Sequence, residues 1–202
     1  MKKIMLFTCV FFTALGINLV AFETAVDKPA PDFKCNDSNG NEHMLSSYEG
    51  KIVVLEWLNH DCPFVKKHYG SGNMQKMQRI YTGKDVIWLS VISSAPGKQG
   101  FCTPDIAKDL TRSKNASPTA VLLDPLGTVG KKYGAKTTPH MFIINKEGIL
   151  VYNGGIDNKR STDPKDVDRA TNYVAKALNE LLAGEEVSTK TSVPYGCSVK
   201  YK

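Results

Sequence analysis

The hydrophobic positions of this chain alternate between two patterns. Runs that are apolar almost throughout are typical of strands buried on both faces of a sheet. Between these runs, polar segments carry apolar residues three or four positions apart, as helices with one buried face do. Such alternation predicts an α/β fold with a central mixed sheet flanked by helices. The expected core strands are 52–58, 86–92, 120–123, 141–145 and 150–153.

Proline and capping residues indicate where the helices begin. A helix is expected directly after Cys62, starting at Pro63 and interrupted at 70–72. Another should start after the N-cap residue Thr103, and a long amphipathic helix should span 163–182.

The region before the first core strand reads as a hairpin extension. A turn at 38–41 predicts a β-hairpin over about 33–45. Ser46 and Glu49 have the spacing of a capping box and predict one helical turn.

The first 21 residues have the pattern of a secretory signal peptide. Lys2 and Lys3 precede the apolar stretch 4–15, and small residues at 19–21 can serve as a cleavage site. We therefore expect a mature domain over 22–184, exported to the periplasm or cell envelope, and a polar tail over 185–202. An uncleaved anchor is the alternative. The Gly-containing tail lacks a strand or helix pattern, so it is expected to be able to swing.

The composition and net charge of the chain indicate which kinds of partner are expected. The chain is 42% hydrophobic and 23% charged, which is ordinary for a globular protein. Its 26 Lys and Arg against 20 Asp and Glu give +6, and the leader contributes two of the lysines. The remaining excess is small and scattered, so nucleic acid is not an expected partner. No segment after the leader predicts a membrane span, so stable membrane association is not expected after cleavage.

Four cysteines follow the leader and none forms a CxxC pair: Cys35, Cys62, Cys102 and Cys197. No Cys and His spacing typical of a metal site occurs, and no cofactor is expected. In an exported protein, four cysteines can form two structural disulfides.

Cys62 is the exception, because it lies between a buried strand and the helix that Pro63 begins. Free N–H groups and the helix dipole at that position lower a thiol pKa. Lys66, Lys67 and His68 add positive potential there, or simply form a solvated helix face.

A second feature precedes the strand at 141–145. Pro139 follows Thr138 there and is a candidate cis-proline, with an ordinary trans turn as the alternative. If cis, its loop should lie against Cys62 and leave the backbone of Thr138 free to pair with an extended substrate.

Together these features resemble the thioredoxin fold. The segments 30–33, 48–51, 61–66, 94–100, 137–141 and 195–201 are similar to the redoxin branch, the alkyl hydroperoxide reductase/thiol-specific antioxidant family. They are most similar to its peroxiredoxin-like, often exported subgroup. The resemblance implies a redox-active Cys62 with Pro63, Thr138 and Pro139 beside it.

The chain also departs from both family patterns. Val65 stands where thioredoxins carry the second cysteine, so the motif cannot close a disulfide on itself. Peroxiredoxins carry a hydroxyl residue and a proline where this chain has Asn59 and Leu55. Efficient peroxidase activity is therefore in doubt, although Asn59 could still donate a hydrogen bond to a substrate.

Three further residues are candidates, Glu56 by the resemblance and Trp57 and Cys197 by their positions in the chain. Glu56 occupies the position of a buried carboxylate that relays protons to the thiol, or else it marks the strand end and reaches solvent. Trp57 is either core or a wall of the site. Cys197 is a candidate resolving thiol, or it forms a structural disulfide with Cys35 or Cys102.

The leading hypothesis is a thiol–disulfide oxidoreductase with Cys62 as nucleophile, acting on thiol or disulfide partners and recycled by an external reductant. A thiol peroxidase is the second hypothesis. A third is a non-enzymatic metal-handling protein in which His60, Cys62, His68 and His140 cluster.

Overall fold

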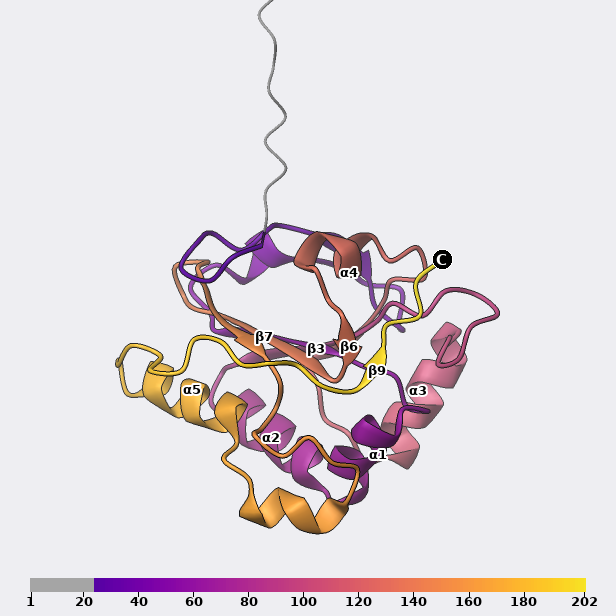
Figure 1. Ribbon diagram of the computed structural model, residues 1–202. Coiled ribbons are helices and arrows are strands. Elements are labelled where there is room, and N and C mark those ends of the chain that lie inside the picture. The colour runs from indigo at the N-terminus through magenta and orange to yellow at the C-terminus, as the bar shows by residue number, and fades with distance from the viewer. Residues whose placement is uncertain (1–23) are drawn as a thin grey trace, which may run out of the picture.

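A five-stranded mixed sheet forms the centre of the computed structural model, which describes residues 24–202 (Figure 1). The strand order is β5-β4-β3-β7-β8; β3, β4 and β5 are parallel, and β7 and β8 run antiparallel to their neighbours. The strands are β3 (Val53–Trp57), β4 (Ile87–Ile92), β5 (Ala120–Leu123), β7 (His140–Ile144) and β8 (Leu150–Gly154). The predicted fold class is confirmed. The predicted leader lies outside the described residues.

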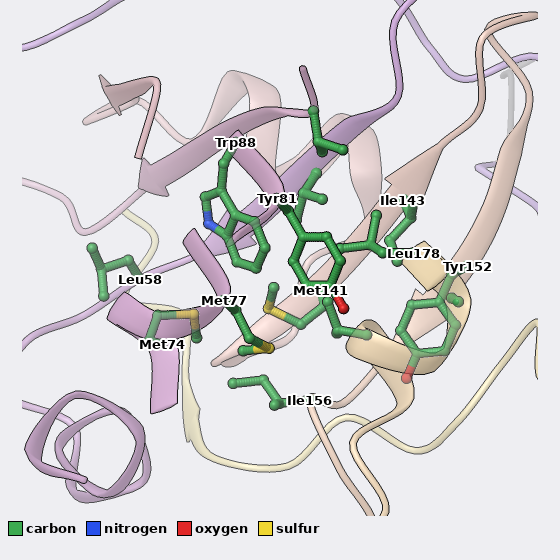
Figure 2. Packing of buried hydrophobic residues seen from close by; sticks show 14 of the residues in the cluster. Leu58, Met74, Met77, Tyr81, Trp88, Met141, Ile143, Tyr152, Ile156 and Leu178 are labelled. Carbon is green, nitrogen blue, oxygen red and sulfur yellow. The ribbon is translucent and has the colours of Figure 1, made fainter. Parts of the chain in front are cut away.

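Alternation along the strands divides the interior into two cores. On one face Val54, Trp88 and Met141 pack against α1 (Pro63–Gly70), α2 (Asn73–Thr82) and α5 (Tyr173–Leu182). Figure 2 shows Trp88 and Met141 in this cluster. On the other face Leu55 and Phe142 pack against α4 (Thr128–Tyr133) and the N-terminal hairpin. Both faces of β3 are covered, which explains its unbroken apolar run.

In the described part of the chain, five α-helices surround the sheet: α1 (Pro63–Gly70), α2 (Asn73–Thr82), α3 (Pro104–Ser113), α4 (Thr128–Tyr133) and α5 (Tyr173–Leu182). The predicted interruption between α1 and α2 is confirmed, with Gly72 in the left-handed conformation before α2. The predicted N-cap of α3 is also confirmed, since the Thr103 side chain accepts from the N–H of Ile106. Sequence reasoning missed α4, which is only six residues long.

The prediction of one helix over 163–182 is wrong. The 3-10 helix η2 (Pro164–Arg169) ends at Ala170, whose backbone is extended. Asn172 then caps a new helix, because its side chain accepts from the N–H of Ala175. Asn172 also forms a β-bridge with Asp157, which ties the break to the loop after β8.

The hairpin is present as β1 (Lys34–Asn36) and β2 (Glu42–Met44). The 3-10 helix η1 (Leu45–Tyr48) follows, but the predicted capping box does not form. The N–H of Ser46 donates instead to the Asp32 carboxylate, at 3.1 Å.

The segment after α5 is docked on the domain. It runs past β8 to the short strand β9 (Cys197–Ser198), which pairs antiparallel with β6 (Thr137–Thr138) (Figure 1). Asn153 bonds to it upstream, and Tyr201 donates to the carbonyl of Ala135 downstream. The expectation of a swinging tail is therefore wrong for this structure. Within residues 24–202, no helix is long and apolar enough to cross a membrane.

Candidate functional site

Cys62 lies between the end of β3 and the start of α1. It is the N-cap residue of α1, with an extended backbone (φ −68°, ψ 126°), and Pro63 is the first helical residue. Its N–H donates to the carbonyl of Asn59 at 3.1 Å, which forms the turn between strand and helix. The side chain is completely buried. The predicted N-cap position is confirmed.

The Thr138–Pro139 loop lies directly against this thiol. The peptide bond between Thr138 and Pro139 is cis, as the sequence suggests. The Sγ of Cys62 donates to the carbonyl of Thr138 at 3.0 Å. Two segments 76 positions apart thus meet at one sulfur atom.

The backbone of Thr138 is not free for a substrate, contrary to expectation. Thr138 pairs with Cys197 in the β6–β9 ladder. The N–H of Cys197 then donates to Sγ of Cys62 at 3.4 Å. Gly196 makes this approach possible, because a Cβ there would lie 2.0 Å from the carbonyl oxygen of Thr138.

The two cysteines at this site have opposite acidities. Burial of Cys62 opposes its ionisation. The Cys197 side chain, together with the N–H groups of Val65 and Cys197, outweighs burial and lowers the pKa of Cys62. Burial and the neighbouring Cys62 thiolate raise the pKa of Cys197 to about 11. Cys62 is therefore the more acidic thiol of the pair and Cys197 the less acidic one.

Of the three basic residues of α1, Lys66 lies on a solvated face as one alternative predicts, whereas Lys67 and His68 do not. Lys66 is exposed, but Lys67 and His68 are buried and form no solvated face. Lys67 donates to the carbonyl of Lys159 at 2.8 Å. Burial lowers the pKa of His68 to about 4, so its ring is neutral near pH 7. Two of the three groups are thus committed to internal contacts.

Asn59 fixes the turn that carries Cys62. Its side-chain oxygen Oδ1 accepts from the N–H of Asp61 at 2.9 Å, and its side-chain amide nitrogen Nδ2 donates to the carbonyl of Gln99 at 3.3 Å. Gly100 packs on this amide so closely that a Cβ would lie 2.3 Å from it. Neither of these two hydrogen bonds involves the Cys62 sulfur.

Glu56 is buried in the middle of the sheet and does not reach solvent. Burial raises its pKa, and hydrogen bonds from four donors oppose the rise. These donors are the Tyr69 hydroxyl, the Gln78 amide, the Trp88 indole and the Ser90 hydroxyl, at 2.8–3.1 Å. None of these hydrogen bonds leads directly to Cys62.

Trp57 is a core residue of the opposite sheet face. It packs against Tyr133 and Phe142, with its indole N–H donating to the hydroxyl of Ser93 at 3.1 Å. Its ring belongs to the core on the other face from Cys62. Trp57 is therefore a core residue and not a wall of the site.

All four cysteines of the described region are free thiols. Cys35 and Cys102 belong to cores on opposite faces of the sheet, so they do not form the structural pair considered above. Burial raises the pKa of Cys35 to about 12 and that of Cys102 above its ordinary value.

The structure does not assemble the metal cluster of the third hypothesis. Residues 24–202 contain no group of three or more His, Cys, Asp or Glu side chains placed to hold a metal ion. His68 contacts Asn73 and Tyr195, and His140 contacts Lys136 and Asn153.

Sequence reasoning missed two residues beside the site. They are Tyr195, two positions before Cys197, and Asp157. The Tyr195 hydroxyl donates to the buried carboxylate of Asp157 at 2.6 Å. Tyr195 and Tyr201 are the two aromatic residues of the segment 185–202, and this was the available signal.

Comparison with known proteins shows the family of this chain. The profile described as "AhpC/TSA family" matches residues 26–153, well over half of the chain. The chain belongs to the AhpC/TSA family. Two curated relatives named "Thiol-disulfide oxidoreductase ResA" come from Geobacillus thermodenitrificans and Geobacillus kaustophilus. They are 29% and 27% identical over 124 residues. Each match covers 61% of this chain and 66% of the relative.

Solved structures extend the similarity of this AhpC/TSA member to the whole fold. An uncharacterised conserved protein from G. kaustophilus superimposes with a TM-score of 0.76 and 24% identity, covering 90% of this chain and 94% of that one. A hypothetical protein from Sinorhizobium meliloti 1021 gives 0.74 and 23%, covering 88% and 95%. The exposed lipoprotein thioredoxin of Streptococcus pneumoniae TIGR4 gives 0.54 and 24%, covering 75% and 100%. At these identities the likeness concerns the fold alone.

Proposed function

We propose that this protein is a thiol–disulfide oxidoreductase in which Cys62 is the nucleophile and Cys197 the resolving thiol. One observation carries the proposal: Cys197 lies on β9 opposite Thr138 and donates its N–H to the sulfur of Cys62. The lowered pKa of Cys62 and the raised pKa of Cys197 suit an attacking and a waiting thiol. The relatives named as thiol-disulfide oxidoreductases agree with this chemistry.

The reaction balances with two protein thiols. The Cys62 thiolate attacks one sulfur of a substrate disulfide and expels the other as a thiolate, leaving a mixed disulfide. Cys197 loses its proton and attacks the Cys62 sulfur, which releases the second substrate thiol and leaves a Cys62–Cys197 disulfide. An external dithiol then takes up the oxidation and restores both thiols.

A trapping experiment tests this assignment. Cys197→Ser should accumulate a mixed disulfide on Cys62 after exposure to oxidised glutathione, whereas the wild-type protein should carry a Cys62–Cys197 disulfide found by peptide mapping. Cys102→Ser is the matched control, because it removes another buried thiol, and it should behave as wild type. Labelling of Cys197→Ser at Cys35 or Cys102 instead of Cys62 contradicts the proposal.

Thiol peroxidase activity is the second candidate, favoured by a specific contact. The edge that an extended peptide would use is occupied by β9, whereas a peroxide is far smaller than a peptide. Peroxide would oxidise Cys62 to a sulfenic acid, and Cys197 would displace water from it to give the same disulfide. Stoichiometric thiol loss with peroxide, without insulin reduction, would favour this reading over the first.

We also propose that the mature protein works outside the cytoplasm, on the basis of its leader pattern. An oxidising compartment gives a disulfide-exchange protein its substrates and requires an external reductant. Intact mass after expression with the full leader should correspond to a chain that begins at Phe22.

A further inference from the structure

Four polar side chains are buried together between α1 and the segment after β8. Lys67 and His68 come from α1, Asp157 follows β8, and Tyr195 lies two residues before Cys197. Their exposed fractions are 1%, 0%, 3% and 6%. Buried polar groups are costly unless each is paired, so their arrangement restricts how the tail can sit.

The hydrogen bonds run in one direction through this cluster. Nδ1 of His68 accepts from the amide of Asn73 at 2.9 Å, which leaves the proton on Nε2. Nε2 then donates to the Tyr195 hydroxyl at 3.1 Å, and that hydroxyl donates to Oδ1 of Asp157 at 2.6 Å. A neutral His68 is what this chain of donors requires.

Lys67 balances the carboxylate at the end of the chain. Its Nζ lies 3.6 Å from Oδ2 of Asp157 and 5.6 Å from the centre of the Tyr195 ring. The Tyr195 ring also packs edge-on against Phe64, with centroids 5.8 Å apart. Tyr195 is therefore held by both its hydroxyl and its ring.

The chain from Tyr195 to Cys197 leaves little freedom between this anchor and the thiol pair. Gly196 lies so close to the Thr138 carbonyl that no side chain fits there. Cys197 pairs with Thr138 in the next position. Only Gly196 separates Tyr195 from Cys197, so an anchored Tyr195 restricts where the Cys197 backbone can lie.

We propose that Tyr195 is a positioning residue for the resolving thiol, held by Asp157 and His68 so that Cys197 stays over Cys62. The inference rests on the proposed function, because it concerns the step in which Cys197 attacks the Cys62 mixed disulfide. A thiol held beside its target reacts as if at high local concentration, so the anchor favours closure of the Cys62–Cys197 bond.

The test uses Tyr195→Phe in the full chain, which keeps the ring and removes only the hydroxyl. The equilibrium constant for forming the Cys62–Cys197 disulfide in glutathione buffers should fall about tenfold, as expected for loss of a hydrogen bond to a charged group. Iodoacetamide labelling of Cys62 in the reduced protein, compared at a pH high enough to ionise this thiol in both proteins, should become faster, because the tail covers that thiol less of the time.

Tyr81→Phe is the matched control. The Tyr81 hydroxyl is also bonded inside the fold, to the carbonyl of Ala175 at 3.1 Å, but away from Cys197. It should lose comparable stability to urea while keeping the glutathione equilibrium within about twofold of wild type. A merely structural role for Tyr195 predicts the same behaviour in both variants.

The outcomes separate this inference from the proposed function. A wild-type protein that never forms the Cys62–Cys197 disulfide overturns both. A wild-type protein that forms it, with an unchanged equilibrium in Tyr195→Phe, overturns only the positioning role.

A second variant keeps the test decisive if Tyr195→Phe does not fold. Gly196→Ala should displace Cys197 directly, because the new Cβ would meet the Thr138 carbonyl, and should lower the same equilibrium. Gly184→Ala has a positive φ as well but no atom within 4 Å of the new Cβ, so it controls for backbone strain alone. Equal equilibria in these two variants would overturn the proposal.

Discussion

The N–H of Cys197 points at the sulfur of Cys62 across 3.4 Å, although 135 positions separate the two residues in the chain. This contact places a hydrogen-bond donor on the atom that the proposed reaction uses as its nucleophile. It stabilises the thiolate, and it holds the second thiol beside the first.

The first prediction concerns the ionisation of Cys62. Because Cys197 and nearby N–H groups lower its pKa, the reduced protein should show one thiolate with a titration midpoint below ~8.5, followed by ultraviolet absorbance of the sulfur. Cys62→Ser should abolish this step, whereas Cys102→Ser should keep it. A midpoint at or above ~8.5 would remove the electrostatic basis for the nucleophile.

The second prediction concerns Glu56. Glu56→Gln replaces an oxygen with an amide N–H group that cannot accept, so at least one of four buried donors loses its acceptor. Each such donor should cost about 1–3 kcal/mol in the free energy of unfolding, measured with urea. Glu147→Gln, at an exposed position, should change it by less than ~0.5 kcal/mol.

The same Glu56 variant tests the relay. If the carboxyl passes protons to the thiol, the pH profile of disulfide reduction should lose the limb that belongs to Glu56. An unchanged profile in a folded Glu56→Gln protein would make this carboxyl purely structural.

The third prediction concerns the oxidised state. A Cys62–Cys197 bond would close a loop of more than 100 residues, which restricts the unfolded chain far more than the already docked native tail. Oxidation should therefore raise the free energy of unfolding by up to roughly 5 kcal/mol in urea. Cys197→Ser should show no such gain under identical oxidation.

The fourth prediction follows from three buried histidines. Burial lowers the pKa of His60, His68 and His140 to about 4, below the ordinary value of 6.5. Between pH 6.5 and 4 the unfolded chain binds protons that the folded protein excludes, so stability should fall as the pH falls through this window. The loss should approach the order of 3 kcal/mol per residue near pH 4.

Urea unfolding at pH 7 and pH 5 checks the fourth prediction. Glu56 acts in the opposite sense, because its raised pKa favours folding at the acidic side of its own titration. Equal stability at both pH values, in the wild type and in Glu56→Gln alike, would show that these histidines do not remain neutral in the fold as a group.

The sequence predicted the features that depend on local pattern. The apolar run at 52–58, the proline after Cys62 and the Thr138–Pro139 loop each indicated their place correctly, because strand burial and helix starts are decided by neighbours in the chain. The break before Asn172 escaped prediction, since the apolar spacing continues across it and only a side-chain cap and a bridge to Asp157 end the helix there.

The contacts of the tail could not be predicted in the same way. Each depends on a single residue meeting a distant partner, as Tyr195 meets Asp157, and no periodicity marks such residues. Lys67 and His68 illustrate the same limit. As charged residues they suit a solvated helix face, but contacts with distant segments bury them: Lys67 with Lys159, and His68 with Tyr195.

The β6–β9 pairing also sets an order of events during folding. The five strands β3, β4, β5, β7 and β8 can form the central sheet before residue 197 arrives, whereas the site closes only through contacts that span most of the chain. Such long loops are entropically slow to close, so the ladder at Thr138 should be among the last contacts made. Until β9 pairs with β6, Cys62 lacks the Cys197 N–H that favours its thiolate. Its thiol is therefore less acidic, and less reactive toward other thiols and disulfides, while the chain is still folding.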